Sequence, residues 1–323
     1  MPLENTAPPG NIKVLYIAGS GRSGSTLLER ILGQFPALVS IGELRHLWLL
    51  KPDQGVLCGC GAAVKDCPFW RPVLAEASVE LTDASFERIR QQRFRVDRIR
   101  FLPQILYPRL ANQAFQADLA AYRRTLLDIY RAIQSRTGCA YIIDSSKDIS
   151  TLYLLHGMPE IDLAILHMVR DSRGVTYSWN KRRKLRPEYT QGEIYMKSRG
   201  YLEMAWDWFY RQLLIHALPR RRHPYLRVRY EDFVQNPRRT FQELGELLKL
   251  PLDVSEILQD GAASLNQPNH TVSGNPIRFQ NGLVKLILDD EWKNGMAFID
   301  LIVVLAVTWP FLLKFGYFRK SRT

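Results

Sequence analysis

Cysteine is scarce in this sequence, because only four of its 323 residues are Cys. Small domains that depend on disulfides contain a much higher share, so the composition excludes a disulfide scaffold. Residues 1–11 are polar and rich in proline, and they lack the apolar stretch of a secretory leader. The composition, with 46% hydrophobic residues, therefore predicts an intracellular globular protein, and we expect it to be cytoplasmic.

A hydrophobic run long enough to cross a membrane is also missing. Residues 301–313 form an uncharged apolar run, but a spanning helix needs about 20 such residues. Asp300, Pro310 and Lys314 interrupt the region further. We expect residues 296–318 to form a buried helix and a turn broken by proline. Peripheral contact with a membrane surface is the alternative. It would be aided by the basic residues Arg319, Lys320 and Arg322.

No motif typical of nucleic-acid binding accompanies the basic residues. The formal net charge is +12, and basic residues gather at 88–100, 181–184 and 220–222. These runs occur without a helix-turn-helix, a zinc finger or an aromatic RNA-binding motif. We therefore expect no nucleic-acid partner. The excess of positive charge instead favours anionic ligands.

A glycine-rich loop at residues 19–26, Gly-Ser-Gly-Arg-Ser-Gly-Ser-Thr, lies between an apolar run at 12–18 and a helical pattern from Leu27. Glycines let the backbone approach an anion closely, and the first N–H groups of a helix can bind it. The loop nearly matches the nucleotide-triphosphate motif, but Ser25 replaces the lysine that reaches the outer phosphates. This difference argues against hydrolysis of ATP or GTP, and Arg22 supplies a cation instead.

The loop resembles the 5′-phosphosulfate loop of the sulfotransferases. These enzymes bind 3′-phosphoadenosine 5′-phosphosulfate (PAPS) and transfer its sulfuryl group to an acceptor. The resemblance implies that PAPS is the sulfuryl donor and that the reaction requires no metal ion. It also implies that the donor is bound by the loop residues Gly21, Arg22, Ser23, Gly24, Ser25 and Thr26.

A second pattern of strand, turn and helix occupies residues 163–179. Arg170 ends the apolar strand, and Ser178 lies in the following helix, which Asp171 or Ser172 can cap. The residues alone also fit an ordinary capped surface helix. Sulfotransferases have an arginine and a serine at such places to grip the 3′-phosphate of the donor. The resemblance implies that role for Arg170 and Ser178.

A third match lies near the C-terminus. Residues 270–279 and 291–294 resemble the family's late cofactor loop and the Trp-Lys-Asn sequence that follows it. The resemblance implies a cofactor contact for Arg278, although the residue alone also fits an arginine that faces water. The three matches follow the family's order along the chain, and they are most similar to bacterial members.

Strand and helix patterns alternate along the chain. This alternation predicts an α/β fold with a parallel sheet covered by helices on both faces, as the phosphate-loop resemblance also implies. We expect a single domain over residues 1–323. A mostly helical insertion at residues 55–137, between the first strand-helix unit and the next strand, is expected to shape the acceptor site. Strands are predicted near residues 12–18, 140–144, 162–169 and 225–230.

Sulfuryl transfer needs a base for the acceptor hydroxyl and donors for the charge on the leaving group. Residues 40–45 resemble the Gly-Glu-x-Arg element of tyrosylprotein and some bacterial sulfotransferases, which implies that Glu43 is the base. The residue alone also fits a glutamate at a helix N-terminus. Arg22 is expected to stabilise the departing phosphate. The family members that act on small phenols use a histidine that is absent here, and the reserve candidates are Asp144, Lys147 and His270.

Three of the cysteines, Cys58, Cys60 and Cys67, lie close together in the sequence. A zinc site would need a fourth ligand, for which His46 is a candidate, but the spacing differs from the usual paired Cys-x-x-Cys. A reversible disulfide and a reduced loop that packs near the acceptor cleft are the alternatives. The sequence does not decide among them, so no metal ligand is assigned.

Together these patterns predict a sulfotransferase that acts on a hydroxyl, or less readily an amine, of a small-molecule, glycan or lipid acceptor. One alternative is a nucleoside or sugar kinase that uses ATP and magnesium, which Ser25 disfavours. The other is a noncatalytic module that binds anions or a membrane surface.

Overall fold

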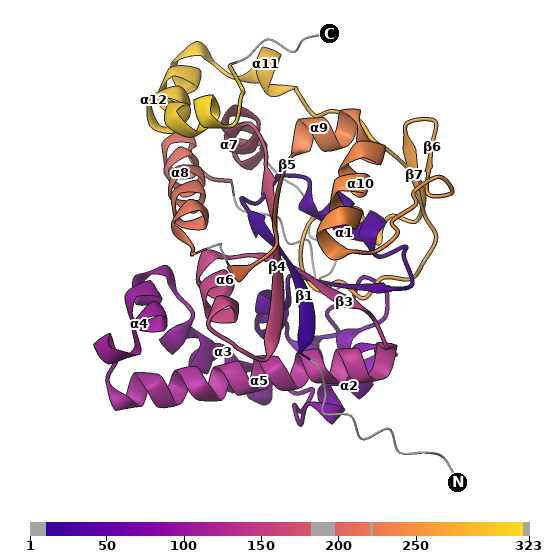
Figure 1. Ribbon diagram of the computed structural model, residues 1–323, viewed down its shortest axis with the longest axis vertical. Coiled ribbons are helices and arrows are strands. Elements are labelled where there is room, and N and C mark those ends of the chain that lie inside the picture. The colour runs from indigo at the N-terminus through magenta and orange to yellow at the C-terminus, as the bar shows by residue number, and fades with distance from the viewer. Residues whose placement is uncertain (1–10, 182–197, 220–221, 319–323) are drawn as a thin grey trace.

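Five parallel strands form the centre of the structure, in the order β2-β3-β1-β4-β5 (Figure 1). The computed structural model describes residues 11–181, 198–219 and 222–318. The predicted α/β fold with a central parallel sheet is confirmed. The strands are β1 (Ile12–Gly19), β2 (Leu38–Gly42), β3 (Tyr141–Lys147), β4 (Ile161–Val169) and β5 (Tyr225–Arg229).

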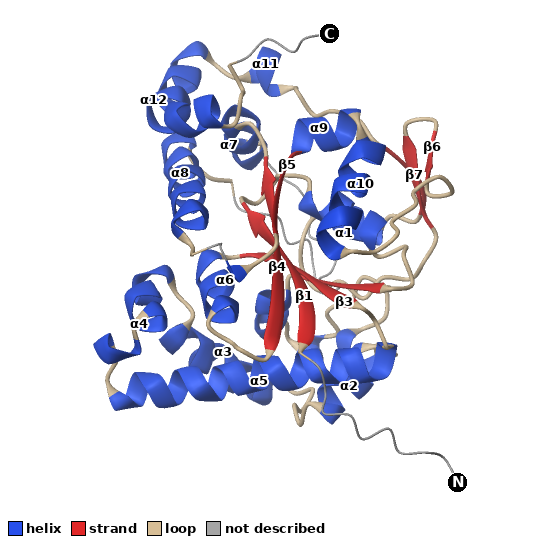
Figure 2. Cartoon of the chain, in the orientation of Figure 1, coloured by secondary structure: helices blue, strands red, loops and turns tan. Residues whose placement is uncertain are grey.

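Helices cover both faces of this sheet (Figure 2). Alternate residues of β1 point to opposite faces, so Val14 and Tyr16 belong to one core cluster and Leu15 and Ile17 to the other. Because both faces are buried, the central strands β1 and β4 are mostly apolar. The first face packs mainly against α2 (Trp70–Glu76), α5 (Gln113–Thr137) and α6 (Ile149–His156), and the second against α1 (Ser25–Leu32), α9 (Tyr230–Gln235) and α10 (Pro237–Leu248).

Two smaller units complete the fold. The helices α7 (Ser172–Asn180), α8 (Tyr201–Ala217) and α12 (Phe298–Lys314) pack together around Trp208 and Leu312. A short antiparallel sheet adds Ala263 and Val284 to the second core cluster. Its strands are β6 (Leu258–Gln259), β7 (Ala262–Leu265) and β8 (Gly282–Lys285).

The edge strand β2 is not predicted by the sequence patterns. It is only five residues long, contains Ser40 and ends in a glycine, so it lacks the long apolar run of β1 and β4. β2 pairs with β3, and the helical insertion therefore lies between these two strands. Residues 55–137 contain α2, α3 (Asp83–Val96), α4 (Leu102–Leu106) and α5, and α5 crosses the end of the sheet where the strands begin (Figure 1).

The C-terminal helix differs from the prediction in two ways. Pro310 does not break α12, which continues to Lys314. Proline removes one backbone donor, and the carbonyl four residues earlier belongs to Ala306, which is exposed and can bind water instead. The helix is also only half buried, because Phe298 and Trp309 are exposed while Val304 and Leu312 lie in the core. Within the described residues, no helix is both long and apolar enough to cross a membrane.

Helix α1 carries two charged residues into the protein interior. Arg30 is 1% exposed and donates to the backbone carbonyls of Arg278 at 2.7 Å and Gln280 at 2.9 Å. These bonds fasten the late loop to α1. Glu29 is also 1% exposed, and its burial raises the pKa of its carboxyl group to about 7, against the opposing effect of Lys147.

Glu29 makes the stability of the fold dependent on pH. Between its unfolded pKa and about 7 the native state binds a proton that the unfolded chain has lost, so the free energy of unfolding falls as pH rises through that range. We expect Glu29→Gln to raise the free energy of unfolding by about 3 kcal/mol at pH 8 and by much less at pH 5. Urea denaturation at the two pH values measures this difference. The exposed Glu246→Gln on α10 is the control, and an equal gain at both pH values would contradict the argument.

Candidate active site

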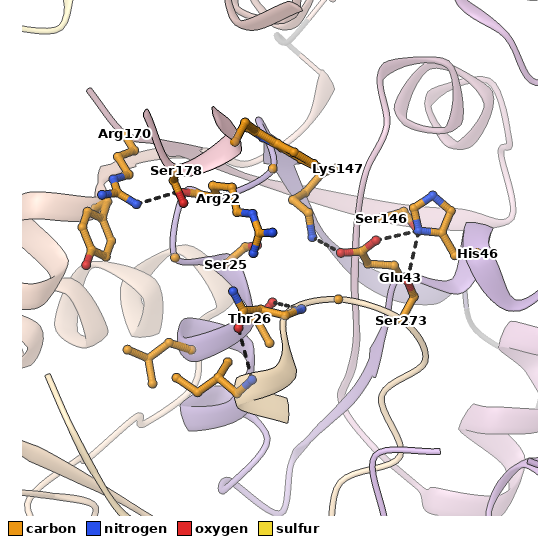
Figure 3. Close-up of a pocket in the computed structure, with 18 of the residues that line it drawn as sticks. Arg22, Ser25, Thr26, Glu43, His46, Ser146, Lys147, Arg170, Ser178 and Ser273 are labelled. Atoms are coloured by element: carbon orange, nitrogen blue, oxygen red, sulfur yellow. Dashed lines mark hydrogen bonds and ion pairs between the residues drawn. The ribbon is translucent and has the colours of Figure 1, made fainter. Parts of the chain in front are cut away.

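A cavity of about 680 Å³ opens at the carboxyl ends of the parallel strands, where ligands bind in open α/β sheets. Figure 3 shows its central residues. The cavity brings together most of the predicted site residues, although they come from distant parts of the chain. Those that line it are Gly21, Arg22, Gly24, Ser25, Thr26, Glu43, Lys147, Arg170 and Ser178.

The glycine-rich loop joins β1 to α1. At two of its positions the backbone conformation and the close neighbours leave room only for glycine. Gly19 has a φ of 144°, and a Cβ there would lie 2.2 Å from the carbonyl oxygen of Met168 on β4. Gly24 has a φ of 82°, and a Cβ there would lie 2.5 Å from the ring of Tyr230. The loop is therefore packed tightly against β4 and the start of α9. The first N–H groups of α1 open into the cavity beside Ser25 and Thr26, which is the arrangement of an anion site.

Two arginines approach each other at this loop. The guanidinium of Arg22 lies over the Trp179 ring, 5.0 Å from its centroid, and Arg170 Nη1 donates to the backbone carbonyl of Arg22 at 3.0 Å. Burial lowers the pKa of Arg22, Glu43 opposes this effect, and Arg170 adds to it. An anion bound between the two cations would relieve their repulsion.

Arg170 follows β4 and is held rigidly. It is 5% exposed, it lies over the ring of Tyr230, and its Nη2 forms an ion pair with Asp289 at 3.0 Å. Burial raises the pKa of Asp289, but Arg170 more than offsets this effect and keeps that pKa below its ordinary value. Ser178 projects from α7 beside Arg170 (Figure 3). As predicted, α7 is capped by Asp171, whose side chain accepts from the backbone N–H of Arg173.

Glu43 lies on the other side of Arg22 (Figure 3). It follows β2 and is 8% exposed. Lys147 Nζ lies 2.6 Å from its Oε1, and His46 Nδ1 lies 2.6 Å from its Oε2. Lys147 ends β3 with a φ of 60°, a left-handed conformation that is uncommon for this residue type and that often occurs at functional sites.

These two partners keep Glu43 ionised. Burial alone would raise the pKa of its carboxyl group, but the charge of Lys147 and the hydrogen bond from His46 more than offset that effect and hold it well below its ordinary value. The carboxylate is therefore charged in the neutral and mildly acidic range, and it can accept a proton without first losing one.

The late loop closes the cavity over Glu43. Its residue Val272 forms a β-bridge with Gly42, and the backbone N–H of Glu43 donates to the Val272 carbonyl at 2.9 Å. Ser273 Oγ then lies 3.4 Å from His46 Nδ1. The third sequence match thus does reach the site, but through residues other than the one that was predicted. Its contributions to the lining are Ser273, Gly274, Asn275 and Ile277.

Four predicted residues do not line the cavity. Arg278 is fully buried and donates to the backbone carbonyls of Thr271 and Leu57, so it ties two loops together and does not face the cavity or water. The side chain of Ser23 is buried beneath the loop. Of the reserve bases, Asp144 is buried and accepts from Tyr130 at 2.7 Å, and His270 lies beside the cysteines. Only Lys147 among the reserves lines the cavity.

Several lining residues were not predicted for this site. The sequence suggests His46 only as a metal ligand, but the structure places it against Glu43. Its spacing of three residues from Glu43 is the one signal that the sequence offers. The lining also includes the apolar residues Leu49 and Met204 and the ion pair between Asp207 and Arg211. The lining can therefore contact both apolar and polar groups of a ligand.

Comparisons with known proteins agree with this fold. The chain matches the family model described as "Sulfotransferase family" over residues 15–254. Its structure is similar to the sulfotransferase domain from the Synechococcus PCC 7002 olefin synthase, with a TM-score of 0.52 and 21% identity, covering 96% of this chain and 98% of that one. The sulfotransferase domain from the curacin biosynthetic pathway has a TM-score of 0.50 and 16% identity, with 94% and 98% covered. Curated protein sequences give no significant match.

Proposed function

Because the chain belongs to the sulfotransferase family, we propose that it transfers the sulfuryl group of PAPS to a hydroxyl, or less readily an amine, of an organic acceptor. The observation that carries this proposal is the single cavity that holds the glycine-rich loop, Arg170, Ser178 and Glu43. The lining contains more basic than acidic side chains, as a highly anionic donor requires. Its basic members are Arg22, Arg45, Lys147, Arg170, Arg199, Arg211 and Lys285, and its acidic members are Glu43, Asp148, Asp207 and Asp289.

The donor supplies an activated sulfur whose bond to the 5′-phosphate breaks as the acceptor oxygen attacks. In our proposal, the loop N–H groups with Ser25 and Thr26 bind the 5′-phosphate end. Arg22 stabilises the negative charge that develops there. Arg170 and Ser178 hold the 3′-phosphate, and Arg170 exchanges its ion pair with Asp289 for the stronger charge of the phosphate. No metal ion takes part in these steps.

The role of Arg170 predicts a selective loss of affinity. We expect Arg170→Ala to weaken binding of adenosine 3′,5′-bisphosphate by about 10- to 100-fold, because a charge-assisted hydrogen bond contributes roughly 1.5–3 kcal/mol. Binding of adenosine 5′-phosphate, which lacks the 3′-phosphate, should change little. Ser178→Ala should show the same selectivity with about a fivefold loss. Isothermal titration of both ligands into each variant measures these affinities.

Arg131→Ala is the matched control, because this arginine is exposed on α5. An equal loss of both ligands in Arg170→Ala would mean that the residue supports the cavity without binding the 3′-phosphate. Titration with ATP and magnesium tests the kinase alternative. Binding of ATP that depends on magnesium and exceeds that of the bisphosphate would contradict the proposed donor.

Glu43 is the proposed base. A carboxylate with a lowered pKa is a weak base, so it accepts the proton late, when bonding to sulfur has made the acceptor hydroxyl acidic. Before the reaction, the charge of Lys147 keeps Glu43 ionised. His46 donates to the same carboxylate in the resting site and orients it.

This pairing predicts a change in the pH profile when Lys147 is removed. In the wild type Glu43 is ionised throughout the neutral and mildly acidic range, so it contributes no acidic limb to kcat. In Lys147→Met burial prevails and the pKa of Glu43 rises, so kcat should fall as the pH is lowered and recover as it is raised. Glu43→Gln should lose about 10²- to 10⁴-fold in kcat at every pH, with bisphosphate affinity retained.

The acidic limb of the wild-type kcat profile distinguishes between Glu43 and His46 as the base. If a histidine accepts the proton, the wild type itself will show an acidic limb that disappears in His46→Gln. That result would assign the proton transfer to His46. It would leave Glu43 as the residue that orients it.

We also propose that the protein works in the cytoplasm at a membrane surface. None of its four cysteines forms a disulfide, as is usual in reducing compartments. The outer side of α12 carries large apolar residues at helical spacing, so that they form one exposed stripe. These residues are Phe298, Ile302, Trp309 and Leu313, with Ile299 beside them.

Vesicle binding tests this surface. We expect the wild type to sediment with phosphatidylcholine vesicles that contain phosphatidylserine, and less with pure phosphatidylcholine. The double variant Phe298→Ser/Ile302→Ser should bind about tenfold more weakly, because two apolar side chains are lost from the contact. Leu110→Ser, at a site that is 63% exposed in the insertion, should bind like the wild type. Equal sedimentation of all three proteins, or none at all, would exclude this surface.

A further inference from the structure

The three clustered cysteines meet a histidine from the far end of the chain. Cys58, Cys60 and Cys67 lie at the start of the insertion, and His270 lies in the late loop, 203 positions beyond Cys67. The three sulfur atoms and one ring nitrogen all lie within 4.8 Å of one another. The proposed sulfuryl transfer uses none of these four side chains.

The distances among these four ligand atoms match the edges of a small tetrahedron. Cys67 Sγ lies 3.6 Å from Cys58 Sγ, 3.7 Å from Cys60 Sγ and 3.4 Å from His270 Nδ1. Cys58 Sγ lies 3.9 Å from the same nitrogen. Tetrahedral zinc, with Zn–S of about 2.3 Å and Zn–N of about 2.0–2.1 Å, separates two sulfurs by about 3.8 Å and a sulfur and a nitrogen by about 3.6 Å.

We propose that Cys58, Cys60, Cys67 and His270 bind a structural Zn²⁺ ion. Four protein ligands close the coordination sphere, and a closed sphere is typical of structural sites because catalytic zinc keeps one position for water. Three thiolates and an imidazole favour zinc over magnesium or calcium, which prefer oxygen ligands. The earlier candidate for the fourth ligand, His46, is wrong, because it lies against Glu43 in the active site.

The alternative of a disulfide fits this geometry less well. Cys67 is almost equally distant from Cys58 and Cys60, and both separations far exceed the about 2.05 Å of a disulfide bond. Any one pairing would also leave the remaining thiol and His270 without a role. A shared metal ion uses all four groups at once.

Neighbouring residues orient these ligands, as the outer shell of a metal site does. The ring of Phe69 is stacked on His270, with centroids 4.9 Å apart and planes 8° apart. Trp70 donates twice: its ring N–H bonds to the His270 carbonyl at 2.7 Å, and its backbone N–H points to Cys67 Sγ at 3.5 Å. Backbone N–H groups directed at sulfur stabilise thiolates.

The proposed ion would join the insertion to the late loop. Hydrogen bonds already connect the two segments, from Gly59 N–H to the Thr271 carbonyl at 3.1 Å and from Asn269 to the Gly59 carbonyl at 3.2 Å. Two residues beyond His270, Val272 pairs with the strand that leads to Glu43. Since metal affinity becomes folding free energy, zinc would stabilise this loop in the position that completes the cavity.

Metal content is the direct test. Protein produced without a histidine tag and in the presence of zinc should carry one Zn²⁺ per chain by inductively coupled plasma mass spectrometry. Cys67→Ser and His270→Asn should lose most of it. Cys139→Ser should retain it, because Cys139 is a buried cysteine outside the cluster and serves as the matched control.

Cobalt substitution of the wild type keeps the proposal testable if the variants do not fold. After removal of zinc, one equivalent of Co²⁺ should give the strong visible bands of a tetrahedral ion and a thiolate-to-cobalt charge-transfer band. Wild-type protein that binds neither ion when its thiols are reduced, or whose intact mass shows a disulfide under native conditions, would overturn the proposal. These measurements need no turnover, so their outcome is separate from that of the proposed sulfuryl transfer.

Discussion

The parallel pairing of β1 between β3 and β4 is the constraint on which the site depends. Residue for residue, β1 runs beside β4 from Ile12 to Gly19, so the loop after β1 leaves the sheet next to the end of β4. Gly19 has room only for hydrogen there, since the Met168 carbonyl occupies the space of a side chain. The glycine-rich loop, Arg170 and Lys147 therefore emerge at one edge. No contact among these side chains is needed to bring them together.

The cavity is a cationic site whose cations are already partly paired. Arg170 binds Asp289, and Lys147 binds Glu43, while Arg22 lies over an aromatic ring. Such pairs remove much of the cost of burying the charges before a ligand arrives. An incoming polyanion would then exchange partners within a prepared network. The site's net charge, more than any single arginine, determines how strongly anions are attracted from a distance.

Features of this site that are formed by neighbouring residues in the sequence could be predicted. Features that require contacts between distant segments could not. The loop at 19–26 and the pair Arg170 and Ser178 each lie within one strand-helix unit, whose geometry follows from local patterns. β2 escaped prediction because a short edge strand with Ser40 has little apolar signal. Arg278 was predicted to contact the cofactor, but its guanidinium donates hydrogen bonds to the backbone carbonyls of two loops. His270 joins the cysteines only through tertiary folding, for which a sequence separation of 203 gives no hint.

The contact between the start of the insertion and the late loop has a consequence for exchanging parts of this protein. Arg278 holds the Leu57 carbonyl, and Gly59 approaches so closely that a Cβ there would lie 2.1 Å from Asn269. A chimera that contains the insertion of another protein would retain a late loop whose shape fits the original insertion. The two segments behave as a single module, although more than half of the chain separates them. An exchange of the insertion should therefore move residues 55–70 and 269–278 together.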